Sequence, residues 1–344
     1  MRKTELSKRK QAILSAIVKA YIDTGEPIGS KNLMALISNS PSSATLRNEM
    51  NELCALGLLT QPHTSAGRIP TDSGYKLYVN TLMNLADMPD YTKSFINSHL
   101  QSTLRESENL PQAAADSLSR LTGLPAFVTC VADLDVSLKQ VQLLTVSQRS
   151  AVMLLIFSDG RTKSSLCHLP DGITQSLISN FQEFVNSKVI NKAIGQFSRA
   201  DMQSSAAQFG INALALTPLL SRLYDMALGA AESSVKTSGA DALYNFCSEP
   251  EASRTFALLN NSDSLIDLLN FLGDDHTLFG QDTKVPELKD KVFVAEKYYC
   301  QGKYCGHAGI IAPSRISYEQ IIPSIRYTAE RLSSVMDTAA GWIE

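Results

Sequence analysis

Residues 42–71, SSATLRNEMNELCALGLLTQPHTSAGRIPT, constrain the fold of this chain more than any other segment. An amphipathic helical pattern is followed at once by a polar, glycine-containing loop between two short apolar runs. A helix followed by such a β-loop can place one helix in a DNA major groove and a wing along the neighbouring backbone. The segment therefore predicts a winged helix-turn-helix near the start of the chain.

Two helical patterns precede this segment. In residues 11–21 the apolar positions follow the spacing of one face of an amphipathic helix. Thr24 and Gly25 are expected to end that helix, and Pro27 delays the next one. Ser30 is expected to cap a short second helix by accepting a backbone N–H with its hydroxyl. The apolar positions are Ile13, Ala16, Ile17, Ala20 and Tyr21 in the first helix and Leu33, Leu36 and Ile37 in the second.

The third helix carries the candidate base-reading face. It is predicted to begin at Ser42 or Ser43, both suitable N-caps, and to end at Gly57. Its apolar stripe consists of Leu46, Met50, Leu53 and Cys54. Arg47 has the fork geometry for guanine or phosphate, and Asn48 can pair with adenine. The candidate DNA contacts of the second and third helices are Ser30, Lys31, Ser43, Ala44, Thr45, Arg47, Asn48 and Asn51.

The wing is predicted from two short strands at residues 58–60 and 68–70. Gly67 is expected to take a positive φ at the turn between them. The polar side chains of the loop can donate hydrogen bonds to phosphate oxygens or to a minor-groove edge. Thr71 is then expected to cap a further helix, with apolar residues at 75, 78, 79, 82 and 83. The candidate wing contacts are His63, Thr64, Ser65 and Arg68.

Charge is distributed unevenly along the chain. Residues 1–83 contain 10 Lys and Arg against 6 Asp and Glu, whereas the whole chain contains 31 against 34. An excess of positive charge at one end of an otherwise acidic protein favours a role in DNA binding, and the net charge of −3 disfavours a sequence-independent nucleoid protein. A winged domain that serves only protein contacts or structure is the alternative interpretation.

On these residues the chain resembles the bacterial heat-inducible transcription repressor family (HrcA type). The matching stretches are AIVKAYIDTGEPIGSKNL, SSATLRNEM, LGLLTQPHTSAGRIPT and GYKLYVNTLM within residues 12–83, and GHAGIIAPSRISY at residues 306–318. The chain departs from the usual family pattern at Cys54, Lys76 and Ala312, where the family usually has glutamate, arginine and glycine. Lys76 would replace a forked phosphate contact by a point charge, and it joins the candidate DNA contacts.

The resemblance implies an α+β multidomain chain. Its expected parts are a winged helix domain at residues 1–86, a linker helix and the first part of a GAF-like α+β domain at 87–188, a mainly helical dimerising insert at 189–275, and the second part of the GAF-like domain at 276–344. It also implies a homodimer that binds an inverted-repeat operator in double-stranded DNA and represses chaperone operons, with the chaperonin as modulator.

The pattern of the remaining residues agrees with an insertion inside an α+β domain. Strands are predicted at residues 141–146, 151–157 and 162–169, the last two joined by Asp159 and Gly160, and an amphipathic helix at 174–186. A mainly helical block at 189–275 follows, interrupted by SVKTSGADAL. Strands at 292–299 and 309–311 and a helix at 318–336 are predicted to close the chain.

No sequence motif supports an enzyme or a bound cofactor. The chain contains no GxxxxGK[ST], GxGxxG after a strand, HExxH or GxSxG motif. Cys300, Cys305 and His307 could supply three zinc ligands, but no fourth ligand lies nearby in sequence, so we assign them to a strand and loop of the sheet domain. Residues 274–276, Asp-Asp-His, are interpreted as a solvated turn.

The sequence also predicts where the protein is located in the cell, and it leaves one alternative function open. No apolar run approaches the roughly 20 residues of a membrane helix, and the basic N-terminus lacks the apolar core of a signal peptide. We therefore expect a cytoplasmic, nucleoid-associated protein without a membrane partner. The alternative function is a small-molecule-sensing regulator, or another ligand-binding protein, that uses its winged domain for protein contacts; it predicts no salt-dependent duplex binding.

Overall fold

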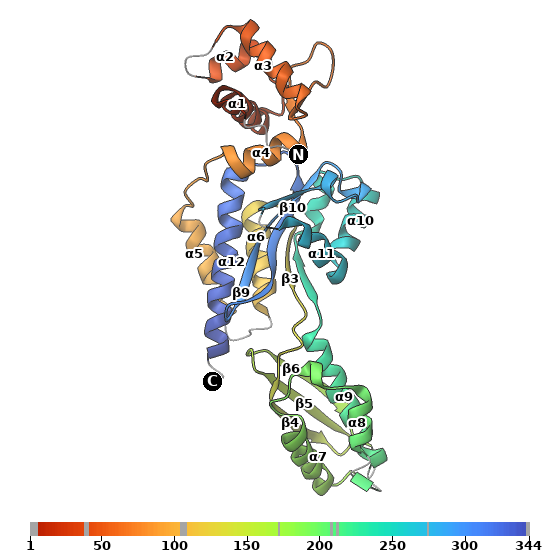
Figure 1. Cartoon of the computed structure of the whole chain (residues 1–344). Helices are drawn as coiled ribbons and strands as arrows, with labels where there is room; N and C mark the ends of the chain where they lie inside the picture. The colour runs from red at the N-terminus through yellow and green to blue at the C-terminus, as the bar shows by residue number, and fades with distance from the viewer. Residues whose placement is uncertain are drawn as a thin grey trace.

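The computed structural model describes residues 6–37, 41–103, 109–170, 173–206, 209–210, 213–273 and 275–341. An N-terminal helical domain, a central sheet domain and a third unit follow one another along the molecule (Figure 1). The chain enters the third unit from the central domain and then returns to it. The multidomain α+β class expected from the sequence is confirmed.

The N-terminal domain has the predicted order of helices and strands. Helix α1 is capped at both ends, by the Ser7 side chain at its start and by Gly25 in the left-handed conformation at its end. Its buried positions include Leu14 and Val18, whereas the predicted Ala16 and Ala20 are only partly buried. Thr71 caps the helix after the wing, as predicted. The elements are α1 Lys8–Thr24, α2 Ser30–Leu36, α3 Ser43–Ala55, β1 Leu59–Thr60, β2 Ile69–Pro70, α4 Asp72–Leu77 and the π-helical turn η1 Tyr78–Leu82.

The central domain is built on an antiparallel sheet of five described strands in the order β7-β3-β10-β9-β8. Helices α5, α6 and α12 lie on one side of the sheet and α10 and α11 on the other (Figure 1), so that each face has its own apolar core. The strands are β3 Ala126–Cys130, β7 Ser234–Ser238, β8 Thr277–Phe279, β9 Lys291–Cys300 and β10 Lys303–Pro313. The helices are α5 Asp90–Ser102, α6 Leu110–Thr122, α10 Glu249–Leu259, α11 Ser262–Leu269 and α12 Tyr318–Gly341.

The third unit contains a separate sheet in the order β4-β5-β6. One face of this sheet packs against helices α7 and α9 in an apolar core that lies wholly within residues 136–231. The chain leaves the central sheet after β3 and returns directly to β7, the strand paired with β3. The elements are β4 Leu138–Ser147, β5 Ser150–Phe157, β6 Thr162–His168, α7 Gln175–Lys188, α8 Arg199–Ala206 and α9 Ala213–Ala231.

The expected insert at residues 189–275 does not coincide with this division of the sheets. The strands predicted near 141–169 and their turn at Gly160, which has φ of 86°, are confirmed. However, these strands form the sheet of the third unit and do not join the central sheet, and SVKTS, expected only as an interruption of the helical block, is strand β7 of the central sheet. Alternation of apolar residues identifies a strand but does not say which sheet it joins. The described residues between β3 and β7, within 131–233, form this mixed unit of strands and helices, which we call the insert below.

An aromatic cluster joins the N-terminal domain to the central domain. Tyr75 is 3% exposed and lies 6.3 Å from the Phe279 ring and 5.9 Å from the Tyr318 ring, centroid to centroid. Tyr78, the next buried aromatic residue along the chain, donates a 2.5 Å hydrogen bond to Glu319 at the start of α12. The core of the N-terminal domain is therefore continuous with one core of the central domain.

Polar contacts surround this cluster, which we call the interdomain joint. Lys19 of α1 pairs with Glu319 at 2.8 Å, and Arg315 donates to the Ile22 carbonyl at 3.1 Å. Asp275 is exposed, as expected for a solvated turn, and it also accepts a hydrogen bond from Asn80 at 3.0 Å; Asp274 lies outside the described residues. The contacts of Tyr78, Asn80 and Arg315 link segments about 200 residues or more apart, whereas His276, which lies 2.7 Å from Glu296, is paired within the central domain.

The carboxylate of Glu319 makes the joint sensitive to pH. Burial opposes its charged form, but hydrogen bonds from Lys19 and Tyr78 lower the pKa of Glu319 below its usual value. We expect Glu319→Gln to reduce the free energy of unfolding by about 1–2 kcal/mol at pH 7. Because a lowered folded-state pKa adds stability only above the unfolded-state value, the difference from wild type should shrink as the pH falls below about 4.5.

Urea denaturation at several pH values measures this difference. Glu330→Gln, an exposed substitution on the same helix, is the matched control. Equal losses of stability for the two variants at pH 7 would contradict the role assigned to Glu319.

Candidate nucleic-acid interface

Helix α3 presents a polar face to solvent because its apolar stripe is buried. Leu46, Met50 and Leu53 are at most 3% exposed. Ser42 is the N-cap, as predicted: its side chain accepts from the Thr45 backbone at 3.2 Å and also lies 3.0 Å from the Thr45 hydroxyl. The predicted contacts that lie exposed on this helix are Ala44, Arg47, Asn48 and Asn51, whereas Ser43 and Thr45 are partly buried.

Ser30 does not cap α2. Gly29 occupies the N-cap position without a side-chain hydrogen bond, and the Ser30 hydroxyl instead lies 2.9 Å from the Ser43 hydroxyl at the start of α3. This hydrogen bond fixes α2 against α3. The sequence alone does not show that the Ser30 side chain contacts another helix. Lys31, the next residue, is exposed beside this contact.

The wing consists of strands β1 and β2 and the segment before α2, which meet near Gly67. Residues Ile28 and Arg68 exchange backbone hydrogen bonds of 3.0 and 2.9 Å, which adds the segment before α2 to the β1–β2 hairpin. The prediction that Gly67 takes a positive φ is wrong. Its missing side chain matters for another reason: a Cβ at this position would lie 2.4 Å from the Ile28 carbonyl carbon. Glycine is required here by close backbone approach.

Two side chains fix the wing in place. Arg68 donates a 2.7 Å hydrogen bond to the Asn51 side chain and so holds the wing against α3. Gln61, which the sequence analysis did not single out, donates to the carbonyls of Thr64 and Ala66 at 2.9 Å each and closes the loop. A glutamine at the first position of a polar loop is the only sequence signal for this role. His63, Thr64 and Ser65 are exposed at the tip.

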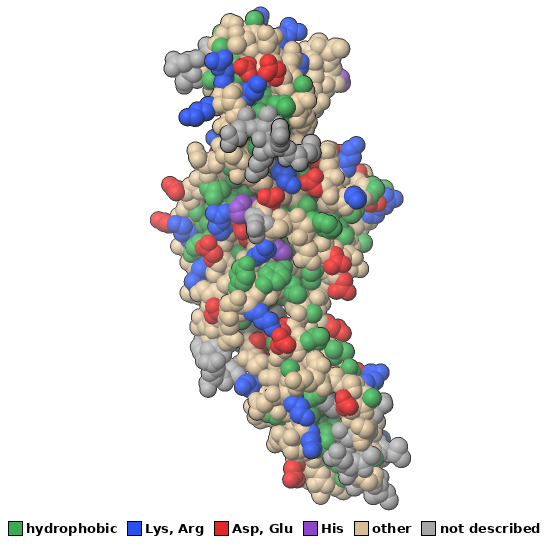
Figure 2. Space-filling view, in the orientation of Figure 1, with side chains coloured by type: hydrophobic (Ala, Val, Ile, Leu, Met, Phe, Trp, Pro, Cys, Tyr) green, Lys and Arg blue, Asp and Glu red, His purple; other side chains and the backbone are tan. Residues whose placement is uncertain are grey.

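Acidic residues of α3 are paired with basic residues of α1. Lys10 lies 2.6 Å from Glu52 and 3.9 Å from Glu49, and Arg9 lies 3.7 Å from Glu49. These pairs offset negative charge on the helix that would otherwise repel phosphate. Figure 2 shows Lys and Arg side chains along the outer edge of the N-terminal domain. Lys31 of α2 and Arg47 of α3 remain exposed to solvent.

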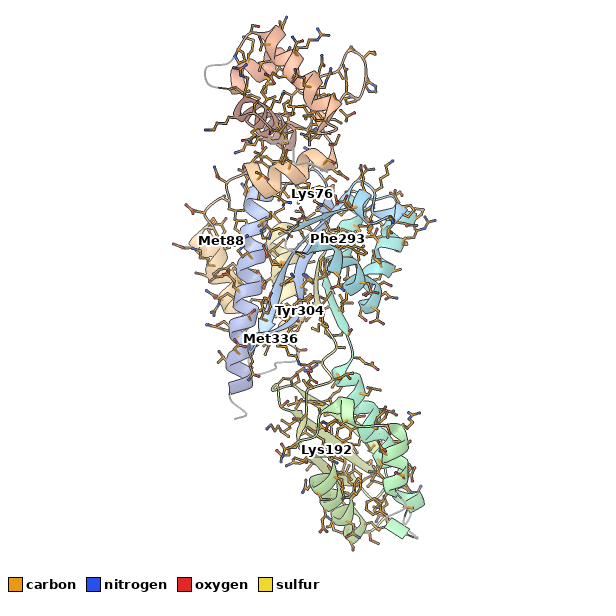
Figure 3. All side chains as sticks on the ribbon, in the orientation of Figure 1. Lys76, Met88, Lys192, Phe293, Tyr304 and Met336 are labelled. Carbon is orange, nitrogen blue, oxygen red and sulfur yellow. The ribbon has the colours of Figure 1, made fainter. Side chains whose placement is uncertain are left out.

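Lys76 lies away from this face. Its ammonium group is 3.2 Å from Asp282 and 3.7 Å from Asp275, both in the central domain. Figure 3 shows Lys76 where the N-terminal and central domains meet. Its position and pairing assign it to the interdomain joint, and they do not fit the predicted phosphate contact.

No described group of three or more His, Cys, Asp or Glu side chains is arranged to hold a metal ion. Within the same residues, no helix combines the length and the apolar character that a membrane span requires.

Comparison with known proteins relates the chain to one family along nearly its whole length. Residues 5–83 match the family described as "Winged helix-turn-helix transcription repressor, HrcA DNA-binding", and residues 108–322 match "HrcA protein C terminal domain". The heat-inducible transcription repressor HrcA of Brevibacillus brevis is 30% identical over 335 residues, covering 96% of this chain and 98% of its own length. That of Bradyrhizobium sp. is 28% identical, covering 96% and 95%.

A solved structure supports the fold. The crystal structure described as that of a hypothetical protein aligns with a TM-score of 0.67 at 19% identity, covering 97% of this chain and 100% of its own. The family relatives are named as transcription repressors, a class of proteins that are not enzymes.

Arg47 and Lys76 provide a direct test of the interface. Arg47→Ala should weaken binding to a cognate duplex by about 1–3 kcal/mol and relax specificity at one base pair, because its guanidinium lies on the exposed face of α3. Lys76→Ala should leave the salt dependence of binding unchanged, because its charge is already paired within the protein. Fluorescence anisotropy across a salt series measures both effects. Unchanged affinity and specificity for Arg47→Ala would mean that α3 is not the reading helix.

Proposed function

Since the chain belongs to the HrcA family of heat-inducible transcription repressors, we propose that it represses a chaperone operon by binding an inverted-repeat operator as a homodimer. The observation that carries this proposal is the exposed polar face of α3 beside a wing that Arg68 ties to it. The site of action is the promoter DNA of the nucleoid, in the cytoplasm. A dimer bound there blocks polymerase sterically.

Helix α3 enters the major groove in this proposal. Arg47 and Asn48 lie in its first turns, from which recognition helices usually reach base edges. Arg68 positions Asn51 for readout instead of contacting phosphate itself. His63, Thr64 and Ser65 at the exposed wing tip supply donors to the neighbouring backbone. Base contacts then come from α3, and positioning contacts come from the wing and Lys31.

An apolar sheet face of the insert supports the homodimer. Leu144, Val152 and Leu166 form one cross-strand row on the face of the β4-β5-β6 sheet opposite α7 and α9. Leu144 is 53% exposed, Leu166 is 67% exposed and Val146 beside them is 64% exposed. Monomeric proteins rarely leave a contiguous apolar surface of this kind uncovered. A second copy of the same face covers it by two-fold symmetry, which matches an inverted repeat in the operator.

The topology supports the chaperonin as modulator. The central sheet closes only after the whole insert has been made, because β3 pairs with β7 and with β10 from much later in the chain. A fold that depends on contacts between distant segments forms slowly, and its folding intermediates expose apolar surface. Under heat stress, unfolded clients occupy the chaperonin, less repressor reaches its folded state and the operon is transcribed.

A cavity favours the second candidate function, a small-molecule-sensing regulator. It encloses about 730 Å³ between the central domain and the insert, within the size range of ligand sites. A metabolite bound there would raise the melting temperature in a saturable way, whereas the repressor function requires no ligand.

Duplex binding tests the main proposal. At about 150 mM salt the folded protein should prefer a labelled inverted-repeat duplex over a scrambled one by a factor of about 10³ or more. Fluorescence anisotropy measures both affinities. Equal, weak binding of the two duplexes by folded protein would contradict sequence-specific repression.

Leu166→Lys tests the dimer interface. Each copy would bury an unpaired ammonium group, so the dissociation constant of the dimer should rise at least about tenfold, or roughly 1.4 kcal/mol. Light scattering over a concentration series measures the change. Leu56→Lys, at a leucine 48% exposed in the N-terminal domain, is the matched control. If neither variant shifts the monomer–dimer equilibrium, the interface lies elsewhere.

Refolding tests the chaperonin. Protein diluted from denaturant should recover more operator-binding activity with chaperonin and ATP than without, because trapped intermediates are released. Titration of the refolded protein with labelled operator duplex measures the fraction of protein that has recovered DNA binding. Full, fast recovery without chaperonin would contradict its role as a folding partner.

A further inference from the structure

The β9–β10 hairpin carries two cysteines on one face because of a bulge. Its register shifts between Tyr304 and Gly306, which leaves Cys305 as the extra residue. Cys300 and Cys305 then both line the cavity between the central domain and the insert. His307 turns to the other face, where its Nδ1 lies 2.8 Å from the Tyr304 hydroxyl and its ring lines a different, smaller cavity. The bulge therefore separates the two thiols from His307, the third of the zinc ligands considered from the sequence.

The Cys305 thiol donates a hydrogen bond to the Lys303 carbonyl at 3.5 Å. Its side-chain hydrogen bonding with Cys300 lowers the pKa of Cys305 and raises that of Cys300, although burial opposes the thiolate of Cys305. Both residues are only partly buried. A thiol with a lowered pKa and access to solvent is the usual attacking group in cysteine oxidation. A neighbouring thiol in contact with it can resolve the product.

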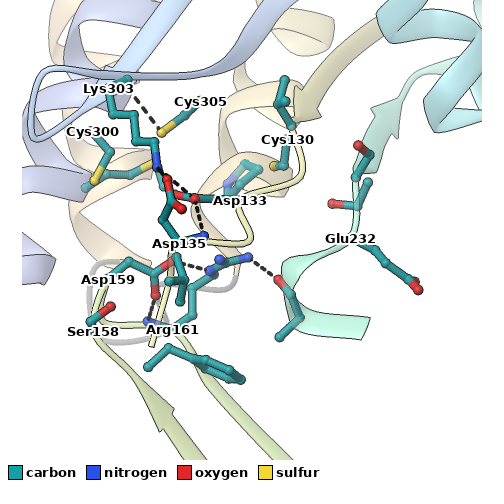
Figure 4. A pocket seen from close by; sticks show the side chains of 18 of the residues that line it. Cys130, Asp133, Asp135, Ser158, Asp159, Arg161, Glu232, Cys300, Lys303 and Cys305 are labelled. Carbon is teal, nitrogen blue, oxygen red and sulfur yellow. Dashed lines mark hydrogen bonds and ion pairs between the residues drawn. The ribbon is translucent and has the colours of Figure 1, made fainter. Parts of the chain in front are cut away.

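The thiol pair lies at the base of the insert. Lys303, at the turn of the same hairpin, pairs with Asp133 at 2.8 Å and Asp135 at 3.0 Å on the segment that leads into the insert (Figure 4). The backbone N–H of Asp133 donates to the Ala231 carbonyl on the segment that leads out. The hairpin therefore contacts the connection into the insert, which is itself hydrogen-bonded to the connection out, so a change of hairpin geometry can reach the unit that carries the apolar sheet face.

We propose that Cys305 and Cys300 form a thiol–disulfide pair that is oxidised by hydroperoxides. The Cys305 thiolate attacks the peroxide, forming an S–O bond as the O–O bond breaks and hydroxide leaves. The Cys300 sulfur, losing its proton to solvent, then attacks the Cys305 sulfur and expels hydroxide, which leaves as water. Both sulfurs are oxidised by one electron each, and one peroxide is reduced to two waters.

Oxidation alters operator binding through the insert. A disulfide removes the Cys300–Cys305 hydrogen bond and shifts the strand ends that carry Lys303. The separation of the two winged domains then changes, because the insert relates the two copies. This consequence rests on the proposed repressor function, whereas the oxidation itself does not.

Peptide mapping tests the pair without reference to DNA. The full chain is treated with hydrogen peroxide, remaining thiols are alkylated, and trypsin digestion follows without reductant. Cleavage after Lys297, Lys303 and Arg315 places the two cysteines in separate peptides, YYCQGK and YCGHAGIIAPSR. We expect these peptides to be linked, with the loss of two hydrogen atoms, and Cys247 to remain alkylated. Absence of the linked peptide, while other thiols oxidise, would overturn the proposal.

Single substitutions distinguish the attacking role of Cys305 from the resolving role of Cys300. Cys300→Ser should leave Cys305 as a sulfenic acid or a more oxidised product, and Cys305→Ser should leave Cys300 reduced; Cys247→Ser is the control and should form the disulfide normally. Operator affinity of oxidised wild type should differ from that of reduced protein by about fivefold or more, and reductant should restore it. A disulfide that forms without any change of affinity would overturn the link to the insert but leave the repressor function intact.

Discussion

The rest of the structure depends on the interdomain joint, where Tyr75 and Tyr78 pack against the central domain. Tyr75 lies among Phe279 and Tyr318, and Tyr78 bonds to Glu319, whose charge Lys19 balances. A reading helix on a flexible tether would search for each half-site independently. A reading helix held by a buried aromatic cluster has a fixed direction relative to the sheet, so the effective concentration at the second half-site depends on the body of the protein.

The insert is attached to the central domain at the end away from the winged domain (Figure 1). Because β3 and β7 are paired, the unit between them leaves and returns at one point of the central sheet. Its own core lies on one side of the β4-β5-β6 sheet, which leaves the apolar row containing Leu144 and Leu166 exposed on the other side, where we propose that a second copy packs. In the proposed dimer, the joint fixes the winged domain at one end, and the insert carries the two-fold axis at the other. The hairpin with Cys300 and Cys305 lies between them, at the base of the insert.

Local features were predictable from the sequence, and long-range ones were not. The caps Ser42 and Thr71 and the strands of the insert depend on neighbouring residues and were found from spacing alone. The partners of Lys76 lie about 200 residues away, and no local pattern separates such a lysine from one that contacts phosphate. Gly67 was expected for its φ, yet the Ile28 backbone requires it, because the sequence does not show which chain passes nearby.

Hydroxyl-radical footprinting of the full chain on operator duplex tests the central claim, that a dimer holds two winged domains at a fixed separation. The account predicts two protected segments related by the two-fold axis of the inverted repeat, their centres a whole number of turns of about 10 bp apart. Insertion of about half a turn between the half-sites should abolish simultaneous protection of both. A single protected segment, or protection of both half-sites whatever their spacing, would contradict it.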